Sequence, residues 1–211
     1  MIKTIIFDFD DTLYTGSDVW GNWVDHVKRV LTELFGSEEK MKTFVEKNNI
    51  VRNVPTRQII KLCEQEGYTA KKFVKILNKY ICPHTGENIE AFSNEVLWEL
   101  RKTKKLYIVS MSTKRYIKHY GEKYGIDLKP FKKIYQTNYC KHKSKGDVYQ
   151  KIMLKNRLKP EEMLVIGDLL KNDVQPALDL GMNGFHFLGD YNQVYDYFTS
   201  NQILDCSKYK K

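Results

Sequence analysis

The second half of the chain alternates short apolar runs with helix-forming stretches, and this alternation constrains the fold more than any other feature. Four runs rich in apolar and β-branched residues predict strands, at residues 105–110, 133–137, 162–168 and 184–188. The stretches between them predict helices, at residues 114–124, 145–157 and 172–180. Repeated strand–helix–strand units form right-handed crossovers and a parallel sheet with helices on both faces. We therefore predict a Rossmann-like α/β fold.

The first hundred residues follow a different pattern. KTIIFD at residues 3–8 predicts one more strand of the same sheet, but from Ser17 apolar residues recur at helical spacings of three and four as far as Gly36. Further helices are expected at residues 38–47, 56–66, 69–80 and 87–102, with no strand among them. The predicted domains are an α/β core of residues 1–15 and 101–211, with an all-helical domain of residues 16–100 inserted into it.

Composition is that of a globular protein. Of the 211 residues, 42% are hydrophobic and 13% aromatic, which is enough to bury a core. No apolar run is long enough to cross a membrane, and the N-terminal MIKTIIFDFD ends in acids where a signal peptide would continue apolar. We expect a soluble, cytoplasmic protein that does not bind membranes.

The cysteines are scattered and form no C-x-x-C pair, so we expect free thiols in Cys63, Cys82, Cys140 and Cys206. Cys82 and Cys140 are each followed two residues later by a histidine. Zinc sites generally use wider spacings, so no zinc site is predicted.

The net charge of +9 arises from 35 basic and 26 acidic residues. Such a charge is compatible with phosphorylated substrates or with loose nucleic-acid binding. Lysines are spread along the whole chain without a long basic block, as expected for solvated helix faces.

Polar residues follow the ends of the predicted strands. In a parallel sheet the carboxyl ends of the strands lie at one edge, where ligands bind. Reading these ends in turn gives Asp8, Asp10, Ser110, Lys143, Lys145, Asp168 and Asp173. Clustered carboxylates repel one another unless a cation or proton compensates them. The pattern therefore indicates a cation site that also holds a nucleophile.

These motifs resemble those of the haloacid dehalogenase-like (HAD) hydrolase superfamily. The matching features are D-x-D-x-T from Asp8 to Thr12, Ser110 at a strand end, a lysine, and the G-D-x-x-x-x-D that ends at Asp173. The resemblance covers the first strand and most of residues 106–188, and the helical insertion is similar to the cap of members that carry it at this place. It implies a magnesium-dependent phosphatase acting on a small phosphorylated metabolite.

The resemblance also implies a role for each residue. Asp8 would attack phosphorus and form an aspartyl-phosphate, while Asp10 would protonate the leaving oxygen and later activate water. Magnesium would be held by the Asp8 and Asp168 carboxylates and the Asp10 carbonyl, with Asp173 orienting the metal or the lysine. Ser110 would hydrogen-bond a phosphoryl oxygen.

The lysine position remains open between two residues. Lys143 fits the family's K-P-D-P-E-I-F pattern without its prolines, and Lys145 fits a shorter pattern equally well. Ser144 and Asp147 are spaced as a capping box, which places both lysines at a helix entrance. The five-residue step from Asp168 to Asp173 accompanies the longer pattern and favours Lys143. Met111 also departs from the family pattern, which often has Asn at this position.

An acid at position 10 favours phosphoryl-group hydrolysis, because family members that cleave carbon–halogen bonds or phosphonates generally carry another residue there. Two alternatives remain: a nucleic-acid end phosphatase, suggested by the charge, and a non-catalytic phosphate-binding module. The aromatic residues Tyr14, Trp20 and Trp23 fit either core packing of the cap or a wall over the substrate.

Overall fold

The computed structural model describes residues 1–17, 22–51, 54, 56–84, 86–137 and 144–209. The chain forms two compact units. One contains Met1–Thr15 and the described residues from Ile89 onward, and the other contains the described residues of Gly16–Asn88. The chain therefore returns to the first unit at Ile89, earlier than the predicted boundary after residue 100. None of the helices in the described part of the chain is long and apolar enough to span a membrane.

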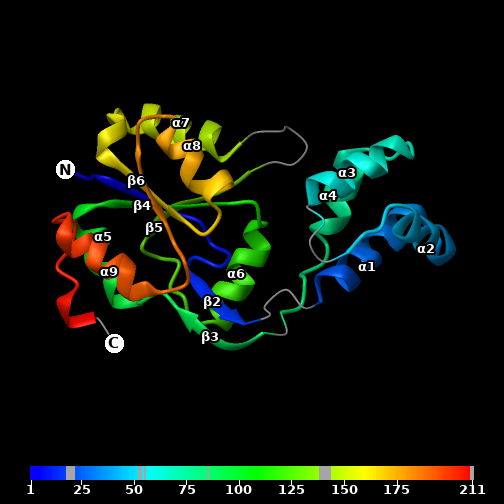
Figure 1. Ribbon diagram of the computed structural model, residues 1–211, viewed down its shortest axis with the longest axis horizontal. Coiled ribbons are helices and arrows are strands. Elements are labelled where there is room, and N and C mark those ends of the chain that lie inside the picture. Colours follow the sequence, from blue (N-terminus) through cyan, green and yellow to red (C-terminus); the bar gives the residue numbers. More distant parts are fainter. Residues whose placement is uncertain (18–21, 52–53, 55, 85, 138–143, 210–211) are drawn as a thin grey trace. The chain divides into compact units, whose positions relative to one another are not determined.

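The first unit, the α/β core, is built on a sheet of five parallel strands, which confirms the predicted fold class (Figure 1). Its spatial order is β5-β4-β1-β6-β7. In chain order the strands are β1 (Thr4–Phe7), β4 (Lys105–Ser110), β5 (Phe131–Gln136), β6 (Met163–Gly167) and β7 (Asn183–His186). Because β1 is the central strand, the residues that follow it lie between the ends of β4 and β6.

Side chains of the sheet alternate between two covered faces. Ile6 and Val165 pack in one buried cluster with residues of α7 (Lys145–Asn156) and α8 (Gln175–Leu178). On the opposite face, the Phe7 ring lies 5.5 Å from that of Phe92. Figure 1 shows α5 (Asn94–Thr103) and α9 (Tyr191–Ser200) on this side of the sheet and α7 and α8 on the other.

The helix starts follow local sequence signals. The capping box at α7 is confirmed: Ser144 Oγ accepts from the Asp147 N–H at 3.2 Å, and an Asp147 carboxylate oxygen accepts from the Ser144 N–H at 2.8 Å. This cap makes Lys145 the first residue of the helix. At α6 (Lys114–Lys123) the cap is a single bond, in which Thr113 Oγ1 accepts from the Tyr116 N–H at 3.1 Å.

Several elements differ from the sequence expectation. The helix predicted from residue 87 is wrong at its start, because β3 (Glu87–Ala91) pairs there with β2 (Tyr14–Ser17), and α5 begins only after its Ser93 cap. Helix α9 was not predicted. The helix predicted at 172–180 is a π-helical turn, η3 (Leu170–Val174), followed by α8. The remaining short helices are η2 (Pro160–Glu162) and η4 (Ser207–Tyr209).

The second unit, the helical unit, has its own core. Its helices are α1 (Trp23–Phe35), α2 (Glu38–Lys47), α3 (Thr56–Gln65) and α4 (Ala70–Leu77). Gly36 ends α1 at a left-handed φ of 69°, as the sequence predicts. Cys63, in the core of this unit, is a buried free thiol. Cys82 and Cys206 are also buried, and Cys140 lies outside the described residues.

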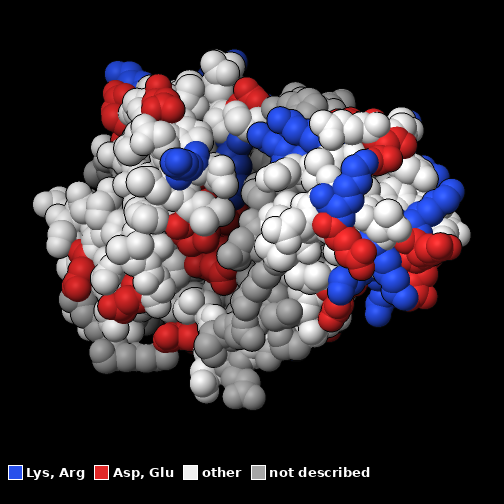
Figure 2. Space-filling view, turned by 45° about the vertical axis from the view of Figure 1, so that its right-hand side comes forward, with Lys and Arg blue, Asp and Glu red and all other residues white. Residues whose placement is uncertain are grey.

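Charged side chains on the helical unit are mixed in sign. Figure 2 shows Lys and Arg interspersed with Asp and Glu there. Several of them form ion pairs, including Lys42 with Glu38 at 2.9 Å and Lys47 with Glu66 at 2.8 Å. Much of the positive charge of this unit is therefore locally balanced.

Candidate active site

The loop after β1 turns sharply at the carboxyl edge of the sheet. The Asp8 N–H still donates to the Ile166 carbonyl at 2.9 Å, so Asp8 continues the strand. A single turn follows, closed by the Leu13 N–H on the Phe9 carbonyl at 3.0 Å. Asp11 takes a left-handed φ of 51°, a conformation that aspartate tolerates better than most residues. The turn holds Asp8 and Asp10 close to the ends of the neighbouring strands.

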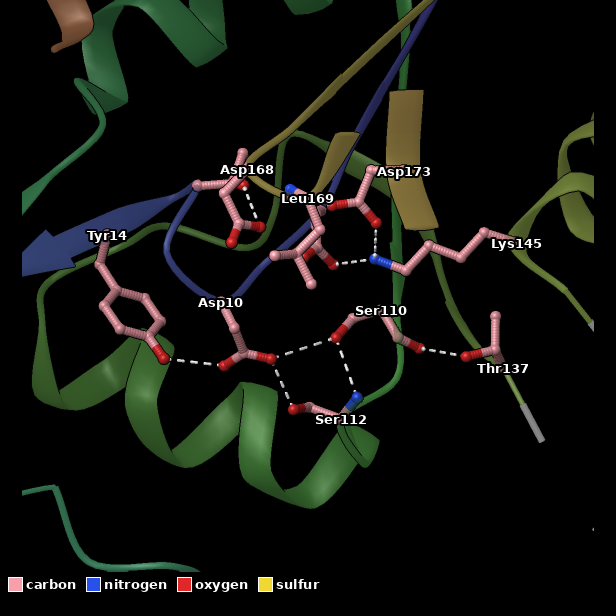
Figure 3. A network of polar contacts seen from close by, with 11 residues as sticks. Asp10, Tyr14, Ser110, Ser112, Thr137, Lys145, Asp168, Leu169 and Asp173 are labelled. Atoms are coloured by element: carbon pink, nitrogen blue, oxygen red, sulfur yellow. Dashed lines mark hydrogen bonds and ion pairs between the residues drawn. The ribbon is translucent and has the colours of Figure 1, made fainter. Parts of the chain in front are cut away.

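Lys145 bridges two buried carboxylates (Figure 3). Its Nζ lies 2.7 Å from Asp8 Oδ1 and 2.5 Å from Asp173 Oδ1. Only 5% of the Lys145 side chain is exposed, and the exposed fractions of the Asp8 and Asp173 side chains are 8% and 0%. Burial alone would lower the lysine pKa, but the two carboxylates outweigh it and the pKa is raised. The lysine is therefore a fixed positive charge.

Asp8, Asp168 and Asp173 form a cluster whose carboxylate oxygens, one from each residue, lie within 4.8 Å of one another. Asp173 is oriented by the Leu169 N–H, which donates to its Oδ2 at 3.0 Å. Its position depends on Gly167, because a Cβ there would lie 2.4 Å from the Asp173 Cβ. Thr12 Oγ1 lies 3.5 Å from Asp168 Oδ1, at the outer limit of a hydrogen bond.

The cluster carries more negative charge than Lys145 neutralises. Burial raises the pKa of Asp8 well above its usual range; Lys145 opposes this, and the neighbouring carboxylates add to it. Burial, with Asp173 and Asp11, raises the pKa of Asp168 to about 7. Hard oxygen ligands in this number fit Mg²⁺, whose charge would offset the repulsion.

Asp10 lies in a separate network of hydroxyl groups (Figure 3). The Tyr14 phenol donates to Oδ1 at 2.7 Å, and the Ser112 hydroxyl donates to Oδ2 at 2.6 Å. Ser110 Oγ lies 3.4 Å from the same Oδ2. Burial raises the pKa of Asp10, while the hydrogen bonds from Ser112 and Tyr14 lower it.

Ser110 ends β4 and is fully buried. Its Oγ accepts from the Ser112 N–H at 2.9 Å, and its carbonyl accepts from the Thr137 N–H, also at 2.9 Å. Its hydroxyl is thus engaged within the protein, between the end of β4 and Asp10.

Most residues singled out from the sequence lie at this edge of the sheet: Asp8, Asp10, Ser110, Lys145, Asp168 and Asp173. Lys143 and Trp20 lie outside the described residues. Trp23 packs against the core of the helical unit, which fits the packing interpretation.

Sequence reasoning missed the contacts of Tyr14 and Ser112 with Asp10. A hydroxyl-bearing residue four positions after Asp10, in a tight turn, was the available signal for Tyr14. No local sequence signal indicates the contact of Ser112 with Asp10, because the two residues are more than one hundred positions apart.

The haloacid dehalogenase-like hydrolase model matches residues 5–186 of the chain. No curated protein sequence gives a match. Among solved structures, a haloacid dehalogenase-like family hydrolase from Streptococcus pneumoniae is 19% identical, with a TM-score of 0.56 over 93% of this chain and 90% of that one.

Two further structures are similar in fold. A HAD phosphatase from Thermococcus onnurineus is 20% identical, with a TM-score of 0.55 over 90% of this chain and 88% of that one. A HAD family enzyme from Bacteroides thetaiotaomicron, in complex with magnesium and inorganic phosphate, is 17% identical, with a TM-score of 0.53 over 92% of this chain and 100% of that one.

Proposed function

Because this chain belongs to the haloacid dehalogenase-like hydrolase family, we propose that it is a magnesium-dependent phosphatase of a small phosphate monoester. The observation that carries the proposal is the pair of carboxyl groups after β1, held in two different environments. Asp8 lies against the Lys145 ammonium, and Asp10 lies among hydroxyl groups. One is thereby suited to be a nucleophile and the other to transfer protons.

In the first half of the proposed reaction, a carboxylate oxygen of Asp8 attacks phosphorus in line. The bond from phosphorus to the ester oxygen breaks, and its electron pair stays on that oxygen. The Asp10 carboxyl gives its proton to the same oxygen, so the alcohol leaves neutral and Asp8 carries the phosphoryl group.

In the second half, the Asp10 carboxylate takes a proton from water as the water oxygen attacks phosphorus. The bond between phosphorus and the Asp8 oxygen breaks, and its electron pair returns to the carboxylate. Inorganic phosphate leaves, and Asp10 again holds the proton with which the cycle began. The balance is one ester and one water to one alcohol and one phosphate.

The other residues supply charge and orientation. Asp8, Asp168 and Asp173, with the Asp10 carbonyl, would hold Mg²⁺, which when bound offsets the charge that phosphate and carboxylates bring together. Lys145 keeps Asp8 in place and would face a phosphoryl oxygen as charge develops there. The structural relative with magnesium and phosphate is consistent with such a site.

A nucleic-acid end phosphatase remains the second candidate within the enzyme class. Its support is the net charge of +9. The mixed signs on the helical unit provide no broad basic surface there, on the face that Figure 2 presents. This favours a small substrate.

A screen of phosphate monoesters, with and without Mg²⁺, tests the proposal. Sugar phosphates, nucleotides, para-nitrophenyl phosphate and 5′- and 3′-phosphorylated oligonucleotides would be included, with Asp8→Asn as the control. We expect Mg²⁺-dependent phosphate release from small esters and none from the variant. Preference for oligonucleotide ends would support the second candidate, and no release from any ester would support a binding module.

A further inference from the structure

We propose that Tyr14 and Ser112 are positioning residues that hold the Asp10 carboxyl at the angle its proton transfers require. This inference rests on the proposed function, in which Asp10 protonates the leaving oxygen. It adds two residues to the reaction that lie outside the family motif in this sequence.

The geometry of the two hydrogen bonds carries the inference. Tyr14 donates to one carboxylate oxygen of Asp10 at 2.7 Å, and Ser112 donates to the other at 2.6 Å. Both lengths are those of well-formed O–H···O hydrogen bonds. Since the two donors hold opposite oxygens, the carboxylate is prevented from rotating about its final side-chain bond. Ser110 Oγ, at 3.4 Å from Oδ2, and the Tyr116 hydroxyl add further contacts to the same carboxyl, so loss of one strong donor should loosen its orientation rather than free it completely.

The two donors are themselves held in place. Tyr14 is fully buried, with its ring 5.4 Å from that of Phe9 and 4.9 Å from that of Tyr124. Its hydroxyl also lies 3.3 Å from the Tyr116 hydroxyl. Ser112 is fixed through its own N–H, which donates to Ser110 Oγ at 2.9 Å. The hydroxyl groups are thus preorganised before any substrate binds.

These bonds leave room for the catalytic proton. Each carboxyl oxygen has two lone pairs, so an oxygen that accepts from a hydroxyl can still carry a proton on its other side. Asp10 is also only partly buried, whereas Asp8 and Ser110 are buried. Proton transfer needs a remaining lone pair of the carboxyl within hydrogen-bond reach of the ester oxygen, so a loss of orientation should slow it.

The test compares hydroxyl-deletion variants on a series of esters with graded leaving groups. Tyr14→Phe removes the phenol oxygen but keeps the packed ring, and Ser112→Ala removes the other donor. Tyr124→Phe is the matched control, because its ring packs on Tyr14 and it has no place in the proposed reaction. Ser112→Thr keeps a hydroxyl at this position and is the conservative comparison for Ser112→Ala. The measured quantity is kcat/KM for alkyl phosphates and para-nitrophenyl phosphate, with thermal melts to verify folding.

Asp10→Asn sets the scale of the experiment. We expect it to lose about 10²–10⁴-fold on an alkyl ester and much less on para-nitrophenyl phosphate, whose leaving group needs little protonation. Tyr14→Phe and Ser112→Ala should show the same selectivity at about 10–100-fold on the alkyl ester, with KM little changed. Tyr124→Phe and Ser112→Thr should follow the wild type on both.

The outcomes separate the two proposals. Suppose that Asp10→Asn loses more activity on alkyl esters than on para-nitrophenyl phosphate. The positioning role is then overturned if both hydroxyl-deletion variants lose activity equally on all esters, or lose none. If Asp10→Asn itself treats all esters alike, the proposed acid role of Asp10 is wrong, and the positioning role falls with it.

Discussion

The Lys145 ammonium lies 2.7 Å from the Asp8 carboxylate, in a place where less than a tenth of either side chain is exposed. A buried charge pair of this kind is strongly destabilised when one partner is removed, because the other remains uncompensated. Lys145 thus has a defined part in the site. Sequence spacing alone favours Lys143.

Lys145→Ala should therefore lose at least about 100-fold in kcat, as expected for removal of one electrostatic stabiliser. The loss of kcat in Lys143→Ala should be at least about ten times smaller than that in Lys145→Ala. Steady-state kinetics on para-nitrophenyl phosphate compares the two variants, with melts to separate misfolding from lost chemistry. A larger loss in Lys143→Ala would return the assignment to the sequence-based choice.

Activity should require a divalent cation, and Ca²⁺ should replace Mg²⁺ poorly. The looser coordination of calcium should disturb the in-line geometry between Asp8 and phosphorus. Phosphate release would be measured after chelation and after each cation is restored. Mg²⁺ should also raise the Tm of the wild type but not that of Asp168→Asn, since binding to the folded state stabilises it. Full activity in excess chelator contradicts the metal's role.

Gly167→Ala should damage both stability and activity. The added Cβ would lie 2.4 Å from the Asp173 Cβ, which belongs to a side chain with no room to move away. We expect a loss of about 1–3 kcal/mol in unfolding free energy and a large fall in kcat. Gly121→Ala is the control, because its nearest neighbour is the flexible end of the Leu128 side chain at 3.1 Å. Equal effects in the two variants would contradict the tight fit at Gly167.

The helical unit should lose stability in mild acid through His26. Burial, with Arg29 nearby, lowers the pKa of His26 to about 4. An unfolded histidine titrates near 6.5, so the unfolded state binds the proton first and stability falls as the pH drops from about 6.5 to about 4. Between pH 7 and 5 the loss should be about 1–2 kcal/mol. In denaturant unfolding, His26→Gln should lose less free energy of unfolding than the wild type between pH 7 and pH 5. The same pH dependence in both proteins would contradict the role of His26.

Much of the α/β core could be predicted because its signals are local. The three inner strands β1, β4 and β6 are short apolar runs, and the Ser144 cap lies within three residues of its partner Asp147. The parallel topology then brings Asp8 and Asp168 to one edge without any knowledge of side-chain contacts. β3 could not be predicted, because ENIEA has little strand character and is extended by pairing with β2.

The details of the site depended on long-range contacts. Ser112 meets Asp10 only after β4 has been placed beside β1. The place of Lys145 in the site likewise depended on its ion pairs with Asp8 and Asp173, since neither carboxylate is near it in the sequence. Sequence pattern thus identified the types of group at the site, but not their pairing.

Covalent phosphorylation of Asp8 is the step on which the proposed reaction depends. Asp10→Asn would be incubated with para-nitrophenyl phosphate and Mg²⁺, because the second half-reaction should be slow there and the intermediate should accumulate. Borohydride reduces an acyl phosphate to an alcohol, so we expect homoserine at position 8 in peptide mass spectrometry. When Asp8 is also replaced by Asn, the peptide should be unmodified. Sustained turnover with homoserine at another carboxylate, or at none, would contradict it.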